Sequence, residues 1–288
     1  ESESESHDVD LGPNDQKRIV QSLIAASAHA AIPAPRRPWL DDLPTCIDIA
    51  SLPIEGDSKV LLGLADLPER QQQLPIYFEP DKDGSMIVFG SSGSGKSAAL
   101  KTIAAAAGMR PELGRAEVYG LDFGSGALLA IARLPHVGSI IEGDDAERIQ
   151  RLLRSLDREM DRRSRAFAAA EASNISEFRS IAEPSASRIF VLVDNFAEFR
   201  KDWEISSARS PFYRMFMRIL TEGRALGVHA VITADRAAAL SGSVTSAISR
   251  KIVLRLADAN GYLYLGVPRD VLDESSPAGR ALLDGAET

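Results

Sequence analysis

The sequence has few residues that could cross-link it and no segment that could hold it in a membrane. Its 288 residues include a single cysteine, Cys46, so the chain cannot form an internal disulfide, and it has no Cys-x-x-Cys metal-ligand spacing. This pattern is typical of a reducing compartment. No apolar run approaches the roughly 20 residues needed to cross a bilayer, and no signal peptide is recognisable. We therefore expect any membrane attachment to lie outside this chain.

An excess of positive charge is also missing. The chain has 33 Lys and Arg against 41 Asp and Glu, a formal net charge of −8. Binding to a nucleic-acid backbone needs clustered basic residues, so nucleic acid is the weaker candidate partner. With 44% hydrophobic and 26% charged residues, the composition instead favours a globular domain with a substantial core.

The first 35 residues differ from the rest. Residues 1–6 alternate Glu and Ser with no apolar side chain to bury, which predicts disorder. From Asp15 the apolar spacing predicts one amphipathic helix, which ends before the proline-rich residues 32–35. We expect residues 1–35 to form an acidic leader, a helix and a linker, and residues 36–288 to form the folded domain.

Short apolar runs alternate with helical patterns through the rest of the sequence. Such runs are typical of strands buried on both faces, and the alternation predicts an α/β fold with a parallel sheet and helices on both faces. The predicted strands are residues 86–89, 116–121, 189–193, 228–232 and 251–256. A shorter strand over 74–78 precedes them, and residues 81–84 have the composition of a turn that reverses it into 86–89.

Residues 90–97 read GSSGSGKS and match the pattern G-x-x-x-x-G-K-[ST] completely. They follow a predicted strand and precede a predicted helix, which is the context this motif requires. In such a P-loop, backbone N–H groups surround phosphate oxygens, the lysine charge reaches the β- and γ-phosphates, and the last hydroxyl binds Mg²⁺. The predicted nucleotide-binding residues are Gly90, Ser91, Ser92, Gly93, Ser94, Gly95, Lys96 and Ser97.

The strand over 189–193 leads directly into Asp194. P-loop folds place such a carboxylate near the Mg²⁺ ion, so Ser97 and Asp194 are the predicted metal-side residues. Hydrolysing members usually carry glutamate next, but this chain has Asn195. An amide can orient a water but cannot take its proton, and Glu198 lies about a helical turn further on. We therefore expect nucleotide binding to survive better than turnover.

Two further residues are candidates for catalysis. Thr233 ends the strand over 228–232, where P-loop ATPases with an extra strand between the P-loop strand and the acid strand place a polar residue facing the γ-phosphate. An arginine acting across a subunit boundary would stabilise charge at that phosphate. The candidate is Arg250, with Arg224 as an alternative. Both lie near the ends of the last core elements.

Arginine recurs along one predicted helix, interleaved with acidic residues. At helical spacing, opposite charges favour a solvated, ion-paired face or a subunit surface over a nucleic-acid contact. The arginines are Arg148, Arg151, Arg154, Arg158, Arg162 and Arg165.

Together with the P-loop and the Asp194 strand, the segment 221–229 (TEGRALGVH) resembles the FtsK/SpoIIIE family of P-loop motor ATPases, in which Gly-Arg-Ala precedes the sensor strand. Further stretches make the chain similar to an ATPase module of EccC, the motor of type VII secretion, over roughly residues 36–285. Asp194 and Asn195 with residues 196–200 look most like a middle module. The further stretches are residues 37–40, 62–68, 134–138, 265–268 and 277–280.

The resemblance implies a RecA-like P-loop NTPase fold of the ASCE type that binds ATP and Mg²⁺. It also implies assembly with other ATPase modules of the same chain or ring, and export of small helical-hairpin proteins of the WXG type. Such a module would work at the cytoplasmic side of the bacterial inner membrane, as the soluble part of a membrane-anchored secretion complex. We expect the chain to be one module of a longer protein.

Two departures from the family pattern bear on activity. Asn195 replaces the expected glutamate, and Asp235 stands where many DNA-pumping relatives have glutamine. Both predict weak hydrolysis in isolation. Two alternatives stay open at this point: a DNA translocase of the same superfamily, and a regulatory module in which bound ATP only locks domain contacts.

Overall fold

The computed structural model describes residues 14–33, 39–53, 56, 58–109, 115–283 and 286–287. The chain divides into two compact units, Glu1–Leu40 and Asp41–Thr288. In the first unit, the predicted helix is confirmed as α1 (Asp15–His29). Asn14 caps its N-terminus, because the Asn14 side chain accepts a hydrogen bond from the Lys17 N–H at 2.8 Å. The disorder predicted for residues 1–6 lies outside the described residues, and the domain boundary at residue 36 stays a prediction.

The second unit is built on a mixed sheet. Within the described residues the sheet has ten strands, in the order β2-β1-β10-β9-β8-β3-β7-β6-β4-β5. The strands from β8 to β5 run parallel, as predicted, and the others extend one side with antiparallel pairs. The strands are β1 (Val60–Leu67), β2 (Gln72–Phe78), β3 (Met86–Phe89), β4 (Ala116–Asp122), β5 (Val137–Glu142), β6 (Arg188–Asp194), β7 (Val228–Ala234), β8 (Arg250–Leu254), β9 (Ala281–Leu283) and β10 (Ala286–Glu287).

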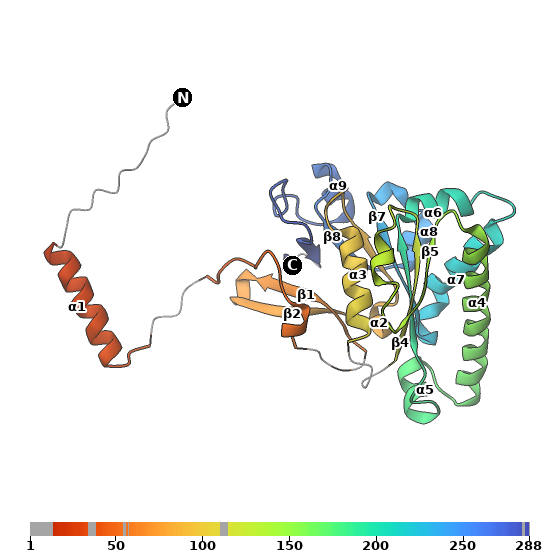
Figure 1. Cartoon of the computed structure of the whole chain (residues 1–288), viewed down its shortest axis with the longest axis horizontal. Helices are drawn as coiled ribbons and strands as arrows, with labels where there is room; N and C mark the ends of the chain where they lie inside the picture. The colour runs from red at the N-terminus through yellow and green to blue at the C-terminus, as the bar shows by residue number, and fades with distance from the viewer. Residues whose placement is uncertain are drawn as a thin grey trace. The chain divides into compact units, whose positions relative to one another are not determined.

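Helices cover both faces of the parallel strands (Figure 1). Phe190 and Leu192 of β6 join the core under α3, whereas Val191 and Val193 join the core under α4 and α7. This alternation explains why every residue of β6 is buried. The helices of this unit are α2 (Pro80–Asp83), α3 (Lys96–Ala107), α4 (Ala146–Ala169), α5 (Ile175–Ile181), α6 (Phe196–Trp203), α7 (Ser210–Leu226), α8 (Gly242–Ala247) and α9 (Ala259–Leu265). Among the helices of the described residues, none is both long enough and apolar enough to cross a bilayer.

The predicted hairpin between residues 74–78 and 86–89 is wrong. β2 pairs with β1, β3 pairs with β7 and β8, and the segment between β2 and β3 is the short helix α2. Pro80 at the first turn of α2 suits a helix start, and Gly84 ends it with φ of 76°. Residues 80–84 therefore carry the chain from the antiparallel part of the sheet into its parallel part.

The strand order places the predicted motifs at one edge of the sheet. β7 lies between β3, which precedes the P-loop, and β6, which ends in Asp194. The predicted extra strand is thus present. Because these strands are parallel, their carboxyl ends meet at one edge, where ligands bind in open α/β sheets.

A buried polar network ties the opposite edge together. The Arg188 guanidinium donates to both oxygens of Asp81, at 2.9 and 2.6 Å, and to Ser176 at 2.8 Å. Burial acts to raise the pKa of Asp81, but the hydrogen bonds and charge of Arg188 outweigh it and hold that pKa below its usual value. Nearby, a ring nitrogen of His229 lies 2.8 Å from the carbonyl oxygen of Gly84. This network joins α2, α5, β6 and β7.

Mild acid is expected to destabilise the fold through His229. Burial lowers the pKa of this imidazole to about 4; the Gly84 carbonyl and Asp81 act to raise it, whereas Arg188 and Arg163 lower it further. Because an unfolded histidine has a pKa near 6.5, the unfolded state takes up the proton first, and stability is lost as the pH falls below that value. The loss should reach about 2 kcal/mol by pH 5.

Denaturant unfolding at pH 7.5, 6 and 5 measures this loss, with His229→Gln as the matched variant. The amide keeps a donor for Gly84 but does not titrate, so its stability should depend less on pH over this range. Equal pH dependence of the two proteins would contradict the assignment. Asp81 does not enter this range, because its pKa is held below the usual value of an aspartate.

Candidate functional site

The P-loop connects β3 to α3, and close approaches favour glycine at two of its positions, Gly90 and Gly95. A Cβ on Gly90 would lie 2.2 Å from Ser94 Oγ, and a Cβ on Gly95 would lie 2.7 Å from the Gly279 nitrogen. Gly95 also has φ of 111° and is the residue before the first turn of α3. These positions keep the loop backbone bare at a helix N-terminus, which is the arrangement that binds phosphate.

A cleft of about 550 Å³ opens beside this loop. Its volume is in the range of small-ligand sites. The cleft receives residues from the P-loop, from the segment after β4, and from the ends of β6 and β7. Its lining consists of Ser92, Gly93, Gly95, Lys96, Ser97, Ala98, Phe123, Gly124, Ser125, Asp194, Asn195 and Asp235.

The structure brings Ser97, Asp194 and Thr233 together. The Ser97 hydroxyl donates to Asp194 Oδ2 at 2.6 Å, and the Thr233 hydroxyl donates to Oδ1 at 2.7 Å. Thr233 Oγ1 also accepts the Asn195 N–H at 2.8 Å. Thr233 is fully buried and is not part of the cleft lining. Its hydroxyl therefore fixes Asp194 and Asn195, which makes Thr233 a positioning residue in this geometry.

The donor set at Ser97 and Asp194 fits Mg²⁺. A hydroxyl and a carboxylate already within 2.6 Å of each other are oxygen ligands of the kind this ion prefers. Mg²⁺ usually takes one or two protein oxygens and completes its shell with phosphate oxygens and water. The glycine-lined loop beside them suits the phosphates, so the residues present fit a magnesium nucleotide.

Lys96 is held by three oxygen atoms. Its Nζ donates to the carbonyl oxygens of Gly90 and Ser91 at 2.7 and 2.8 Å, and it lies 2.9 Å from Asp235 Oδ1. An ammonium has three protons to donate. The sequence predicted Lys96 in this loop, but no pattern in it indicated that Asp235, two residues past Thr233, would pair with it.

Asn195 adopts a backbone conformation that suits asparagine. Its φ is 58°, in the left-handed region, and its side-chain nitrogen donates to the Phe123 carbonyl at 3.2 Å. Asparagine tolerates this region better than most residues. Glu198 pairs with Lys201 at 3.0 Å and lines a neighbouring cavity rather than the cleft.

The structure does not bring Arg250 to the cleft of its own chain. Arg250 begins β8 and pairs in register with Met86, the first residue of β3, so it lies at the amino edge of the sheet. Its Nε is 3.6 Å from Asp83 Oδ2. Arg224 also contacts this edge, where it donates to the Lys82 carbonyl at 3.4 Å. Either arginine could act only on the site of another module.

The predicted arginine-rich helix is α4, and opposite charges accompany it as expected. Arg162 and Arg163 both bind Glu159, at 2.7 Å. The hydrogen bond from Arg162 is the main cause that holds the pKa of Glu159 below its usual value. Arg218 of α7 adds ion pairs to Asp157 and Asp161. Much of this helix is thus an ion-paired surface.

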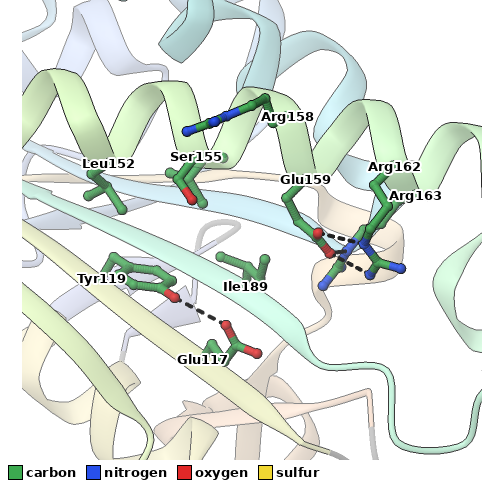
Figure 2. A pocket seen from close by; sticks show the side chains of 10 residues that line it. Glu117, Tyr119, Leu152, Ser155, Arg158, Glu159, Arg162, Arg163 and Ile189 are labelled. Atoms are coloured by element: carbon green, nitrogen blue, oxygen red, sulfur yellow. Dashed lines mark hydrogen bonds and ion pairs between the residues drawn. The ribbon is translucent and has the colours of Figure 1, made fainter.

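A second cavity, of about 450 Å³, lies between α4 and the strands β4 and β6 (Figure 2). The pattern of the sequence did not predict it. Its carboxylates are already bound within the fold: Glu159 by the two arginines, and Glu117 by the Tyr119 hydroxyl at 3.2 Å and the Ser187 hydroxyl at 2.6 Å. Arg162 and Arg163 are thus already engaged by a carboxylate in this cavity.

Residues that follow β8 form hydrogen bonds with the backbone of the P-loop. The Gly279 N–H donates to the Ser94 carbonyl at 2.9 Å, and the Ser91 N–H donates to the Arg255 carbonyl at 2.8 Å. The Arg280 guanidinium in turn donates to the Leu43 carbonyl at 2.9 Å. Residues 277–280, which the sequence singled out only for their family pattern, are thus packed against the nucleotide loop.

Known proteins are similar to this chain in sequence, and some also in fold. The ESX secretion system protein YukB of Bacillus subtilis (strain 168) is 33% identical over 235 residues, which are 81% of this chain and 15% of YukB. The solved structure of ATPases 2 and 3 of EssC from Geobacillus thermodenitrificans is 27% identical with a TM-score of 0.68, covering 88% of this chain and 46% of that chain. Thermomonospora curvata EccC (ATPases 2 and 3), in complex with a signal sequence peptide, is 26% identical with a TM-score of 0.70, covering 81% and 42%.

The matches place this chain in a family but cover only a part of the relatives. The chain spans 15% of the length of YukB. The sequence profile of the FtsK/SpoIIIE family matches residues 57–267, which include the P-loop, the Asp194 strand and the Thr233 strand. The chain therefore belongs to the FtsK/SpoIIIE family, and the proteins it is similar to include components of ESX and type VII secretion systems.

Proposed function

We propose that this chain is an ATP-binding motor module of a type VII secretion ATPase, with residues 36–288 as its ATPase domain. The observation that carries the proposal is the contact between Ser97 of the P-loop and Asp194 at the end of β6, 2.6 Å apart beside the cleft. This contact joins the phosphate loop to the metal-side acid, as nucleotide hydrolysis requires.

The cleft would bind ATP with Mg²⁺. Residues 90–97 would hold the phosphates, and Ser97 and Asp194 would hold the metal, which when bound neutralises phosphate charge. Lys96 would bind the β- and γ-phosphates after leaving Asp235. Thr233 would keep Asp194 and Asn195 in place through the hydrogen bonds of 2.7 and 2.8 Å that it makes to them.

Turnover would be weak in isolation. Asn195 lines the cleft where hydrolysing relatives carry glutamate, and its amide can orient a water but cannot accept its proton. An arginine supplied by a neighbouring module would raise the rate by stabilising charge at the γ-phosphate. Arg250 is a candidate donor only toward such a neighbour, because it lies at the amino edge of its own sheet.

The partners would be other ATPase modules of the same chain or ring and exported helical-hairpin proteins of the WXG type. A Thermomonospora curvata EccC has been solved with a signal sequence peptide, which supports an exported protein as partner. We propose the cytoplasmic side of the bacterial inner membrane as its place, with anchoring segments outside this chain.

A regulatory module that binds ATP without hydrolysing it is the second candidate. It is favoured by Asn195 in the cleft and by Lys96, whose Nζ contacts three oxygen atoms of the protein. A DNA translocase, the third possibility, has the net charge of −8 against it. A gel shift with duplex DNA at several salt concentrations separates it from the first, since a translocase would bind DNA in a salt-dependent way.

Calorimetric titration with Mg²⁺-ATP and steady-state hydrolysis test the proposal, first on this chain and then on the chain joined to its neighbouring modules. We expect binding in both and faster hydrolysis in the joined form. Absence of nucleotide binding in both forms would remove the proposed function. Tight binding without hydrolysis in either form would favour the regulatory module.

A further inference from the structure

The charged residues described at the nucleotide cleft carry a net negative charge. The charged residues that line it are one cation, Lys96, and two carboxylates, Asp194 and Asp235. Asp194 is engaged by two hydroxyl groups and faces the expected metal. Asp235 pairs with the lysine instead, since its Oδ1 lies 2.9 Å from Lys96 Nζ, and its side chain is 69% exposed.

The ion pair engages the ammonium group of Lys96, which the phosphates of ATP would need to bind. The other two contacts of Lys96 Nζ are to loop carbonyls, which are neutral and belong to the same P-loop. The carboxylate is the charged competitor. A phosphate that takes its place must remove Lys96 from Asp235 and then lie near a carboxylate of its own charge, which costs free energy.

More carboxylates line a cavity next to the nucleotide cleft. A neighbouring cavity of about 580 Å³ shares Phe123, Gly124 and Ser125 with the cleft. Three more acidic residues that are not buried line that cavity, Glu142, Asp144 and Asp202, together with Glu198, which is paired with Lys201. A free triphosphate therefore approaches a negative surface, whereas a nucleotide carrying Mg²⁺ brings part of its own neutralisation.

We propose that Asp235 is a specificity-determining residue of the nucleotide site, which competes with phosphate for Lys96 and so selects the magnesium complex of ATP over free ATP. The inference rests on the proposed nucleotide binding. A neutral side chain at this position would neither pair with Lys96 as a charge nor repel phosphate. Asp235 thus lowers affinity at this cleft and makes it depend on the metal.

Asp235→Asn tests the proposal, because it removes the charge and keeps the size. Affinities are measured by calorimetry for ATP, ADP and adenosine, each with Mg²⁺ and with a chelator. The variant should bind ATP about threefold to tenfold more tightly than the original chain. The gain should be smaller for ADP and absent for adenosine, because it arises at the phosphates. It should also be larger with chelator than with Mg²⁺.

Two variants serve as controls. Asp235→Glu keeps the charge and should not gain affinity. Glu222→Gln removes a carboxylate from an ion pair with Arg218 on α7, near the amino edge of the sheet, and should leave binding unchanged. A gain of equal size in Glu222→Gln would show a general charge effect and would overturn the proposal.

The remaining outcomes are also decisive. Equal or weaker ATP binding by Asp235→Asn, with the original chain binding normally, would overturn the role of Asp235 and leave the proposed function intact. If neither protein bound nucleotide with or without Mg²⁺, the proposed function would fail and the inference with it. The exposure of Asp235 makes loss of folding on substitution unexpected, and thermal melting of each variant checks this.

Discussion

Lys96→Ala is expected to weaken ATP binding about a thousandfold, since charge-assisted hydrogen bonds contribute about 1.5–3 kcal/mol each and this ammonium can supply more than one to the phosphates. Lys96 is the cation that lines the described cleft. Its removal also leaves Asp235 facing the nucleotide without the lysine that pairs with it. Loss of charge and gain of repulsion therefore act in the same direction.

Equilibrium titration with Mg²⁺-ATP measures the effect. Lys201→Ala is the matched control, because it makes the same chemical change at an exposed lysine of α6 that pairs with Glu198. Only the Lys96 variant should lose affinity. Retained binding by Lys96→Ala would remove the P-loop cleft as the nucleotide site.

Asn195→Glu is expected to raise ATP turnover by on the order of 10²–10⁴, the usual contribution of a general base. The position lines the cleft, so a carboxylate placed there could accept a proton from the attacking water. The substitution has a cost, because φ of 58° at this residue suits asparagine better than glutamate. We expect a small loss of stability alongside the gain in rate.

Asn195→Gln separates the base from the length of the side chain. Glutamine has the size of glutamate without its charge, so it should leave turnover near its original level. Rates are measured at saturating Mg²⁺-ATP, with binding checked for each variant. If the original chain and Asn195→Glu both bound ATP tightly and neither hydrolysed it, the enzyme interpretation would give way to the regulatory module.

The parts of the fold predicted from sequence are those with a continuous apolar signal. β3, β6 and β7 are buried on both faces, so their sequences are short continuous apolar runs, which are typical of buried strands. β5, at the outer edge of the sheet, includes Gly138 and Ser139 and was missed. β1 was missed for a similar reason, because Gly63 and Asp66 interrupt its apolar run.

The sequence predicted several of the residues that line the candidate cleft, but not their mutual contacts. A strand end can be read from the sequence, yet the direction in which its last side chain points depends on packing. Thr233 thus lies at the expected strand end, but its hydroxyl is buried between Asp194 and Asn195. Arg250 also lies at a strand end, and only the strand directions show that this end is the amino edge.

The P-loop is linked to two parts of the unit that are distant in sequence. Ser94 is bound by the backbone of Gly279, and the next residue, Arg280, binds the carbonyl of Leu43. A rearrangement of the loop backbone on nucleotide exchange would therefore alter the hydrogen bonds to the segments near residues 43 and 280. These two segments are suitable positions for spectroscopic probes of nucleotide state.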